Sequence, residues 1–141
     1  MMVLVDTPIW SLVLRRRKEV LSTKDRVLEN ELAALVQTRR AHLIGPVRQE
    51  LLSGLREEAV FLHLRDLLRP FPEPALIPED YELAAEYSNR CGASGIAGSP
   101  TDFLICAVAA RRDWQVFTTD RDFIGYARHL PITLYRPRES N

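Results

Sequence analysis

The sequence predicts an α/β protein, a three-layer α/β/α sandwich with a central parallel sheet. Short segments rich in Val, Leu, Ile and Phe alternate along the chain with longer stretches whose apolar residues recur at helical spacing, as in parallel sheets covered by helices on both faces. The first segment, residues 1–5, has no polar residue, which indicates a strand buried on both faces. Because the 141 residues contain no linker and no internal repeat, we expect one domain over residues 1–141.

In the first half of the chain, the strand at residues 1–5 is followed by a helix for which Thr7 is a suitable N-cap and Pro8 a suitable first residue. We expect that helix to end near a basic run at residues 15–18. Gly45 and Pro46 mark the turn into a later helix. The other elements expected here are a helix over residues 24–39, a strand over 41–45, a helix over 46–55 and a helix through 61–68.

In the second half, residues 75–77 are expected to form a short strand between prolines, and Pro78 to start a helix. The Gly- and Ser-rich residues 91–100 are expected to form a loop that ends with Ser99 as N-cap and Pro100 as first residue of the next helix. That helix is apolar on most sides, so it should be central. The remaining elements are a strand over residues 113–120, a short helix through 123–126 and a strand over 131–135.

Composition restricts the class of protein. The chain has 19 basic and 19 acidic residues, which does not favour the broad basic surface of many nucleic-acid binders. It does not exclude binding, because arginines cluster at residues 15–17, 39–40, 111–112 and 136–138. No apolar run approaches the roughly 20 residues that span a bilayer, and the N-terminus does not resemble a secretory signal. We therefore expect no membrane partner and a cytoplasmic protein.

Several familiar sites are absent from the sequence. Cys91 and Cys106 form neither a disulfide framework nor a metal motif, and are expected to be small buried residues in a reducing compartment. The three histidines lie too far apart in sequence for a zinc motif. The glycines of residues 92–98 do not fit a dinucleotide-binding motif, and neither a phosphate-binding P-loop nor a G-x-S-x-G motif is present.

Four acids stand out by their context. Asp6 and Asp120 each follow an apolar strand, and the carboxyl ends of parallel strands meet at one edge of a sheet. Asp102 begins the most apolar helix, and Glu50 lies beside the apolar stripe of its helix. Each alone has an ordinary explanation as a helix cap, a dipole partner or a surface residue. Together they require a positive counterpart, for which Mg²⁺, or else Mn²⁺, is the suitable cation.

The ordered motifs "VLVDTPIW", "PVRQELLSG", "SPTDFLICAVAARR" and "VFTTDRDF" resemble the four successive motifs of PIN-domain ribonucleases, in the branch of VapC-type toxins. The resemblance extends from residue 2 to about residue 134. It implies that Asp6, Glu50, Asp102 and Asp120 are the acidic catalytic residues. Asp6, Asp102 and Asp120 would then be metal ligands, directly or through water, and Glu50 would ligate the metal or orient the attacking water.

Three further positions have possible auxiliary roles. Thr118 resembles the small hydroxyl residue that the family places beside its site, and Asp122 matches a variable acidic position. Pro8 departs from the family, because serine is common there, and leaves Thr7 as the only local hydroxyl. The resemblance also implies an RNA substrate, hydrolysed by a metal-activated water, a cognate antitoxin as partner, and a homodimer.

Two other functions stay open at the level of the sequence. One is a PIN-like protein that acts mainly as a binding or regulatory partner in an antitoxin–DNA complex. The other is an acidic pocket that accepts a phosphoryl group, which needs a well-placed lysine. The only lysines, Lys18 and Lys24, come after the first helix and are poorly placed for that role.

Overall fold

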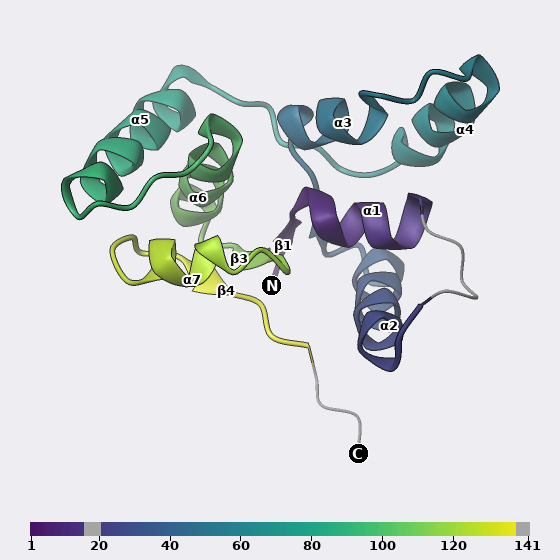
Figure 1. The fold of residues 1–141 in the computed structure, drawn as a ribbon, viewed down its shortest axis with the longest axis horizontal. Helices are drawn as coiled ribbons and strands as arrows, with labels where there is room; N and C mark the ends of the chain where they lie inside the picture. Colours follow the sequence, from purple (N-terminus) through teal and green to yellow (C-terminus); the bar gives the residue numbers. More distant parts are fainter. Residues whose placement is uncertain (16–20, 138–141) are drawn as a thin grey trace.

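The fold is built on a four-stranded sheet. The structure, a computed structural model, describes residues 1–15 and 21–137 (Figure 1). The strands pair in the order β2-β1-β3-β4, and every pairing is parallel. Their bounds are β1 Val3–Val5, β2 Ala41–His42, β3 Gln115–Phe117 and β4 Thr133–Leu134. The predicted central parallel sheet is confirmed.

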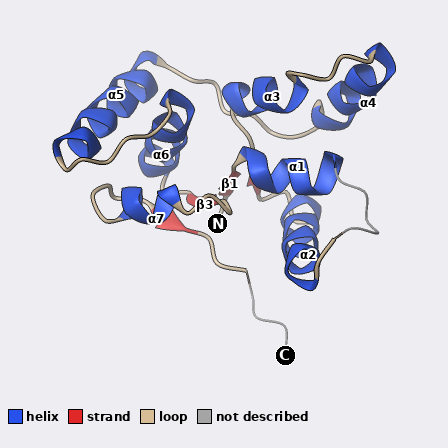
Figure 2. Cartoon of the chain, viewed as in Figure 1, coloured by secondary structure: helices blue, strands red, loops and turns tan. Residues whose placement is uncertain are grey.

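Helices cover both faces of this sheet. In the described part of the chain they are α1 Thr7–Arg15, α2 Thr23–Gln37, α3 Gly45–Leu52, α4 Glu58–Leu68, α5 Pro78–Ala93, α6 Pro100–Arg112 and α7 Asp122–Ala127. The crossover from β1 to β2 and the crossover from β2 to β3 run in opposite directions along the sheet. Right-handed crossovers therefore place their helices on opposite faces. Figures 1 and 2 show α1 and α2 on one side of the strands, and α5 and α6 on the other. No described helix has the length and apolar character needed to cross a bilayer.

The core is centred on β1 and α6. All three residues of β1 are fully buried, and seven consecutive residues of α6, from Phe103 to Ala109, are buried too. A helix that is apolar on all sides has to lie inside the protein, which agrees with the central position predicted for it. Both cysteines are buried and free.

A buried ion pair joins the start of α5 to the end of α6. Asp80, in the first turn of α5, is fully buried and lies 2.7 Å from Arg111 and 2.8 Å from Arg112 at the end of α6. Its other oxygen accepts a hydrogen bond from the Ile77 N–H. Hydrogen bonding to Arg112 is the main reason that the pKa of Asp80 lies well below its usual range. The arrangement fixes α6, the helix that carries Asp102.

The strands predicted at residues 41–45, 113–120 and 131–135 are shorter in the structure, and three further local predictions are wrong. Residues 75–77 form no strand, because their backbone groups bind side chains: the Ala75 carbonyl accepts from Arg112 and the Ile77 N–H donates to Asp80. The predicted loop at residues 91–100 starts too early, since α5 continues to residue 93 and the chain turns at Gly95, where φ is +76°. Thr7 is not the N-cap of α1, because the helix begins at Thr7 and the Asp6 carbonyl accepts the N–H groups of Ile9 and Trp10, which places Asp6 at the cap position.

Only Arg15 of the basic run at residues 15–18 lies within the described residues. Residues 16–18 of that run, and Arg138 of the last arginine cluster, lie outside the described residues. Of the other arginines, Arg111 and Arg112 are engaged with Asp80, and Arg40 donates to the Met1 carbonyl.

Candidate active site

The end of β1 meets the end of β3 at one edge of the sheet. Val5 is in register with Phe117, and the Asp6 N–H donates to the Phe117 carbonyl at 2.9 Å. Asp6 therefore lies opposite Thr118, whose hydroxyl donates to Asp6 Oδ2 at 2.8 Å. The register of two strands thus brings together side chains that are 112 residues apart in sequence.

Asp6 is a buried carboxylate with few compensating contacts. Asp6 is only 5% exposed, and its second carboxylate oxygen, Oδ1, accepts the Thr7 N–H at 2.8 Å. Burial raises the pKa of Asp6 to about 6; the two hydrogen bonds oppose this rise, whereas the nearby carboxylates of Asp102 and Asp120 add to it. Asp6 is therefore a carboxylate that its own protein does not neutralise.

Asp120 is tied to Asp6 through a shared threonine. The Thr118 hydroxyl, which donates to Asp6, also accepts the Asp120 N–H at 3.0 Å. Asp120 Oδ1 in turn accepts the Asp122 N–H at 2.9 Å. The Asp122 side chain itself is exposed, so its observed contribution here comes from the backbone. Thr118 holds two strand-end residues in one arrangement.

Asp102 approaches the same place from the first turn of α6. Its N–H donates to the N-cap Ser99 at 3.1 Å, as the sequence predicted for that helix start. The Tyr126 hydroxyl donates to Asp102 Oδ2 at 2.8 Å. Burial is the main cause that raises the pKa of Asp102, the two hydrogen-bonding side chains lower it, and the charge of Asp120 raises it further. The mutual effects of Asp6, Asp102 and Asp120 place the three carboxylates in one electrostatic cluster.

Glu50 joins this cluster at its edge. It is exposed on α3, and its Oε2 accepts the Thr7 hydroxyl at 2.7 Å. Since the Thr7 N–H is bound to Asp6, one threonine connects both acids. The fold thus brings all four predicted acids to one edge of the sheet: the charges of Asp102 and Asp120 act on Asp6 despite their repulsion, and Glu50 is linked to Asp6 through Thr7.

The donor set fits a hard divalent cation that retains water. As they stand, no three Asp, Glu, His or Cys side chains of residues 1–15 and 21–137 form a ready-made metal cage. However, an all-oxygen set suits Mg²⁺ or Mn²⁺, and Mg²⁺ usually keeps several waters and binds only one or two carboxylates. In the described chain, no ion pair neutralises Asp6, Asp102 or Asp120. Asp6, Asp102 and Asp120 are therefore the residues suited to hold such an ion.

Comparison with known families matches the PIN domain over residues 3–129. This chain belongs to the PIN-domain family. PIN domains are generally nucleases, which supports a hydrolase that acts on nucleic acid. A comparison with curated protein sequences gives no significant match.

Solved structures share the fold of this PIN domain at low sequence identity. FitAcB from Neisseria gonorrhoeae has a TM-score of 0.73 at 18% identity, over 96% of this chain and 98% of that one. VapBC2 from Rickettsia felis, bound to a promoter DNA fragment, has a TM-score of 0.72 at 16% identity, over 96% and 98%. A toxin–antitoxin complex from Klebsiella pneumoniae has a TM-score of 0.69 at 17% identity, over 98% and 99%. The likeness covers the whole PIN fold.

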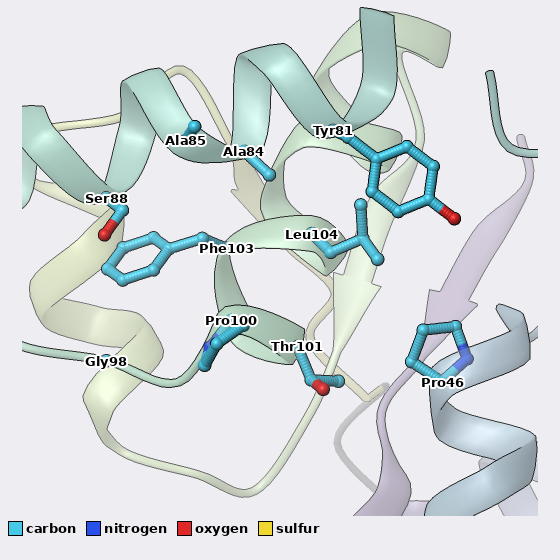
Figure 3. Close-up of a pocket in the computed structure, with 10 residues that line it drawn as sticks. All are labelled: Pro46, Tyr81, Ala84, Ala85, Ser88, Gly98, Pro100, Thr101, Phe103 and Leu104. Atoms are coloured by element: carbon cyan, nitrogen blue, oxygen red, sulfur yellow. The ribbon is translucent and has the colours of Figure 1, made fainter. Parts of the chain in front are cut away.

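An apolar pocket lies beside the acidic cluster. It has a volume of about 410 Å³ and opens between α5, the start of α6 and Pro46 of α3 (Figure 3). Thr101 forms part of its wall, whereas the neighbouring Asp102 does not. The acids of the PIN domain are therefore outside the pocket.

Sequence reasoning missed one partner of these acids and one structural ion pair. Tyr126 was expected only as part of a short helix, and nothing in its spacing relates it to Asp102. The Asp80 ion pair was also missed, although a carboxylate two residues after the helix-starting Pro78 resembles the position of Asp102 after Pro100. The common signal is an acid in a helix's first turn, and it does not distinguish a structural acid from a functional one.

Proposed function

We propose that this PIN domain is a divalent-metal-dependent endoribonuclease and the toxin of a VapC-type toxin–antitoxin pair. One observation carries the proposal. Asp6 is buried at the end of β1, its pKa is raised to about 6, and the charges that act on it are those of the carboxylates Asp102 and Asp120. A role as helix cap does not explain why the carboxylates of Asp102 and Asp120 lie close enough to act on Asp6, because like charges raise the free energy of the folded state.

The roles of the residues follow from their contacts. Asp6, Asp102 and Asp120 would hold Mg²⁺, or Mn²⁺ in its place. When bound, such an ion lowers the pKa of a coordinated water and balances the charge of a phosphodiester. Thr118 fixes Asp6 through Oδ2 and Asp120 through its N–H. Glu50 is turned toward the site by Thr7 and, at the exposed rim, is suited to orient the attacking water.

The partner is proposed from the fold relatives. FitAcB, VapBC2 and the Klebsiella pneumoniae complex support an antitoxin as the partner of this chain. The uncompensated acids would attract a basic side chain from such a partner, which would compete with the metal. An RNA substrate, a homodimer and a cytoplasmic location are part of the same proposal.

A second function is favoured by a specific observation. A solved structure of FitAB, which shares this fold with a TM-score of 0.76 at 16% identity over 99% of this chain and 98% of that one, is bound to a DNA fragment, and so is VapBC2. A regulatory complex with antitoxin and DNA is therefore the alternative, and it needs none of the four acids for chemistry. Cleavage assays separate the two functions.

The test is cleavage by the purified full chain. We expect it to cut single-stranded or loop RNA with Mg²⁺ or Mn²⁺ and to lose this activity in EDTA. Asp6→Asn should lower the rate at least about 100-fold, because metal-assisted charge stabilisation contributes several kcal/mol. Asp66→Asn is the matched control, since Asp66 is exposed and paired with Arg65. Equal cleavage with and without EDTA, or equal rates for the two variants, would refute the proposal.

A further inference from the structure

The short helix α7 contributes a buried phenol to the acidic cluster. Tyr126 is fully buried, and its hydroxyl donates to Asp102 Oδ2 at 2.8 Å. Within the described residues, Asp102 Oδ1 makes no comparable hydrogen bond. The protein thus fixes Asp102 through Oδ2 alone.

Aromatic packing determines the direction of this phenol. The ring of Tyr126 lies 5.1 Å from the ring of Phe103, at an interplanar angle of 47°. It also lies 5.0 Å from the ring of Phe123, at 72°. Phe103 follows Asp102 in α6, and Phe123 precedes Tyr126 by one helical turn in α7. Since one ring comes from each helix, the hydroxyl is aimed at Asp102 by the packing of α7 on α6.

Gly98 keeps the place of the phenol open. A Cβ atom at this position would overlap the Tyr126 hydroxyl and lie 2.9 Å from its Cζ and 3.0 Å from Phe103 Cε2. The backbone there does not have the positive φ of Gly54 and Gly95, so glycine is required for space and not for conformation. Figure 3 shows Gly98 on the loop before α6, beside Phe103.

We propose that Tyr126 is a positioning residue that turns Asp102 toward the divalent cation, and that Gly98 is the residue that permits it. The inference rests on the proposed metal-dependent function. Ligating side chains are commonly oriented by hydrogen bonds from groups behind them. A phenol suits this role because it donates a hydrogen bond without bringing a positive charge that would replace the metal's own. Arg or Lys at this position would neutralise Asp102, as Arg111 and Arg112 do for Asp80.

The test measures the affinity of the full chain for Mn²⁺ and Mg²⁺ by titration calorimetry, in the absence of RNA. We expect Tyr126→Phe to weaken binding about tenfold or more, which is the usual effect of removing such an outer partner. Gly98→Ala should have a similar effect by displacing the phenol. In the double variant the two effects should not add, because both remove the same hydrogen bond.

The matched control is Tyr135→Phe. The Tyr135 hydroxyl donates to Glu31 Oε2 at 3.1 Å, and Glu31 is a buried carboxylate outside the cluster. This variant loses the same chemical group but should keep the wild-type metal affinity. Melting temperatures of the metal-free variants in EDTA show whether each variant is folded, so that a loss of metal affinity can be assigned to positioning and not to unfolding. If Tyr126→Phe does not fold, Gly98→Ala carries the test against the same control.

The outcomes distinguish this inference from the proposed function. If the wild type binds metal and cleaves RNA while Tyr126→Phe and Gly98→Ala bind metal with unchanged affinity, the positioning role is refuted and the proposed function stands. If Tyr135→Phe weakens metal binding as much as Tyr126→Phe does, the effect is one of general stability, and the inference is likewise refuted. If the wild type binds neither Mn²⁺ nor Mg²⁺, both fail.

Discussion

Asp6 and Asp80 are both buried aspartates beside a helix start, yet their surroundings are opposite. Asp80 is fully buried between Arg111 and Arg112, which hold its pKa well below the usual range. Asp6 is 5% exposed, and its charged neighbours are carboxylates, so its pKa is raised to about 6. The first acid is neutralised by its own chain and serves the fold. The second is left for an external cation, and this contrast separates a structural acid from a functional one.

The largest effect on stability is expected at Asp80. Asp80→Asn removes the partner of two partly buried arginines and should lower the free energy of unfolding by about 3 kcal/mol at neutral pH. Since the folded-state pKa of Asp80 is depressed, the stabilisation is present above the unfolded pKa of about 4 and is lost as pH falls below it. Denaturant unfolding at pH 7 and at pH 3 checks this. If Asp80→Asn is as stable as the wild type at pH 7, Asp80 is not a stabilising structural acid and the contrast with Asp6 is contradicted.

The opposite sign is expected at Asp6, in protein held in EDTA. Its pKa rises from 3.8 in the unfolded chain to about 6 in the fold, so the folded state holds a proton that the unfolded state releases. Stability should therefore fall as pH rises from about 4 to 6, by on the order of 2–3 kcal/mol. Asp6→Asn should not show this fall. Unfolding curves of both proteins from pH 4 to 7.5 measure it, and parallel pH profiles would contradict the raised pKa.

A smaller effect is expected at Thr118, which joins Asp6 to Asp120. Thr118→Val keeps the shape but removes a donor and an acceptor, so it should lower stability by about 1 kcal/mol. It should also slow cleavage about tenfold, because Asp6 loses the bond that fixes Oδ2. Its exposed neighbour Thr119 provides the control variant Thr119→Val. Equal rates for the two variants would show that the Thr118 hydroxyl does not position Asp6.

Much of the fold could be predicted because its signals are local. The apolar run before Asp6 predicts β1, and the pair Ser99–Pro100 predicts the start of α6; in both cases residues adjacent in sequence are sufficient. The strand predicted at residues 75–77 is wrong for two reasons: the Ile77 N–H donates to Asp80, three residues ahead at the start of α5, and the Ala75 carbonyl accepts from Arg112. The contact with Arg112, 37 residues away, is one that local sequence does not contain.

The same limit applies to the site. Asp6 and Asp120 could be placed together, because parallel strands carry their following residues to one edge. The contact of Asp102 with Tyr126 depends on how α7 packs on α6. The link from Glu50 to Asp6 depends on a threonine that sequence reasoning assigned to a helix cap. Identifying these partners requires the three-dimensional packing.

The most direct test of the central claim compares melting curves of the wild type and Asp6→Asn at pH 7.5, each in EDTA and in saturating Mg²⁺. If Asp6 is an acid that awaits a cation, the variant melts at the higher temperature in EDTA, because one uncompensated charge is gone. Mg²⁺ then raises the melting temperature of the wild type more than that of the variant, since a ligand that binds only the folded state stabilises it by mass action. The account is contradicted if Asp6→Asn melts at the lower temperature in EDTA and gains as much from Mg²⁺ as the wild type, because Asp6 would then be a structural helix cap.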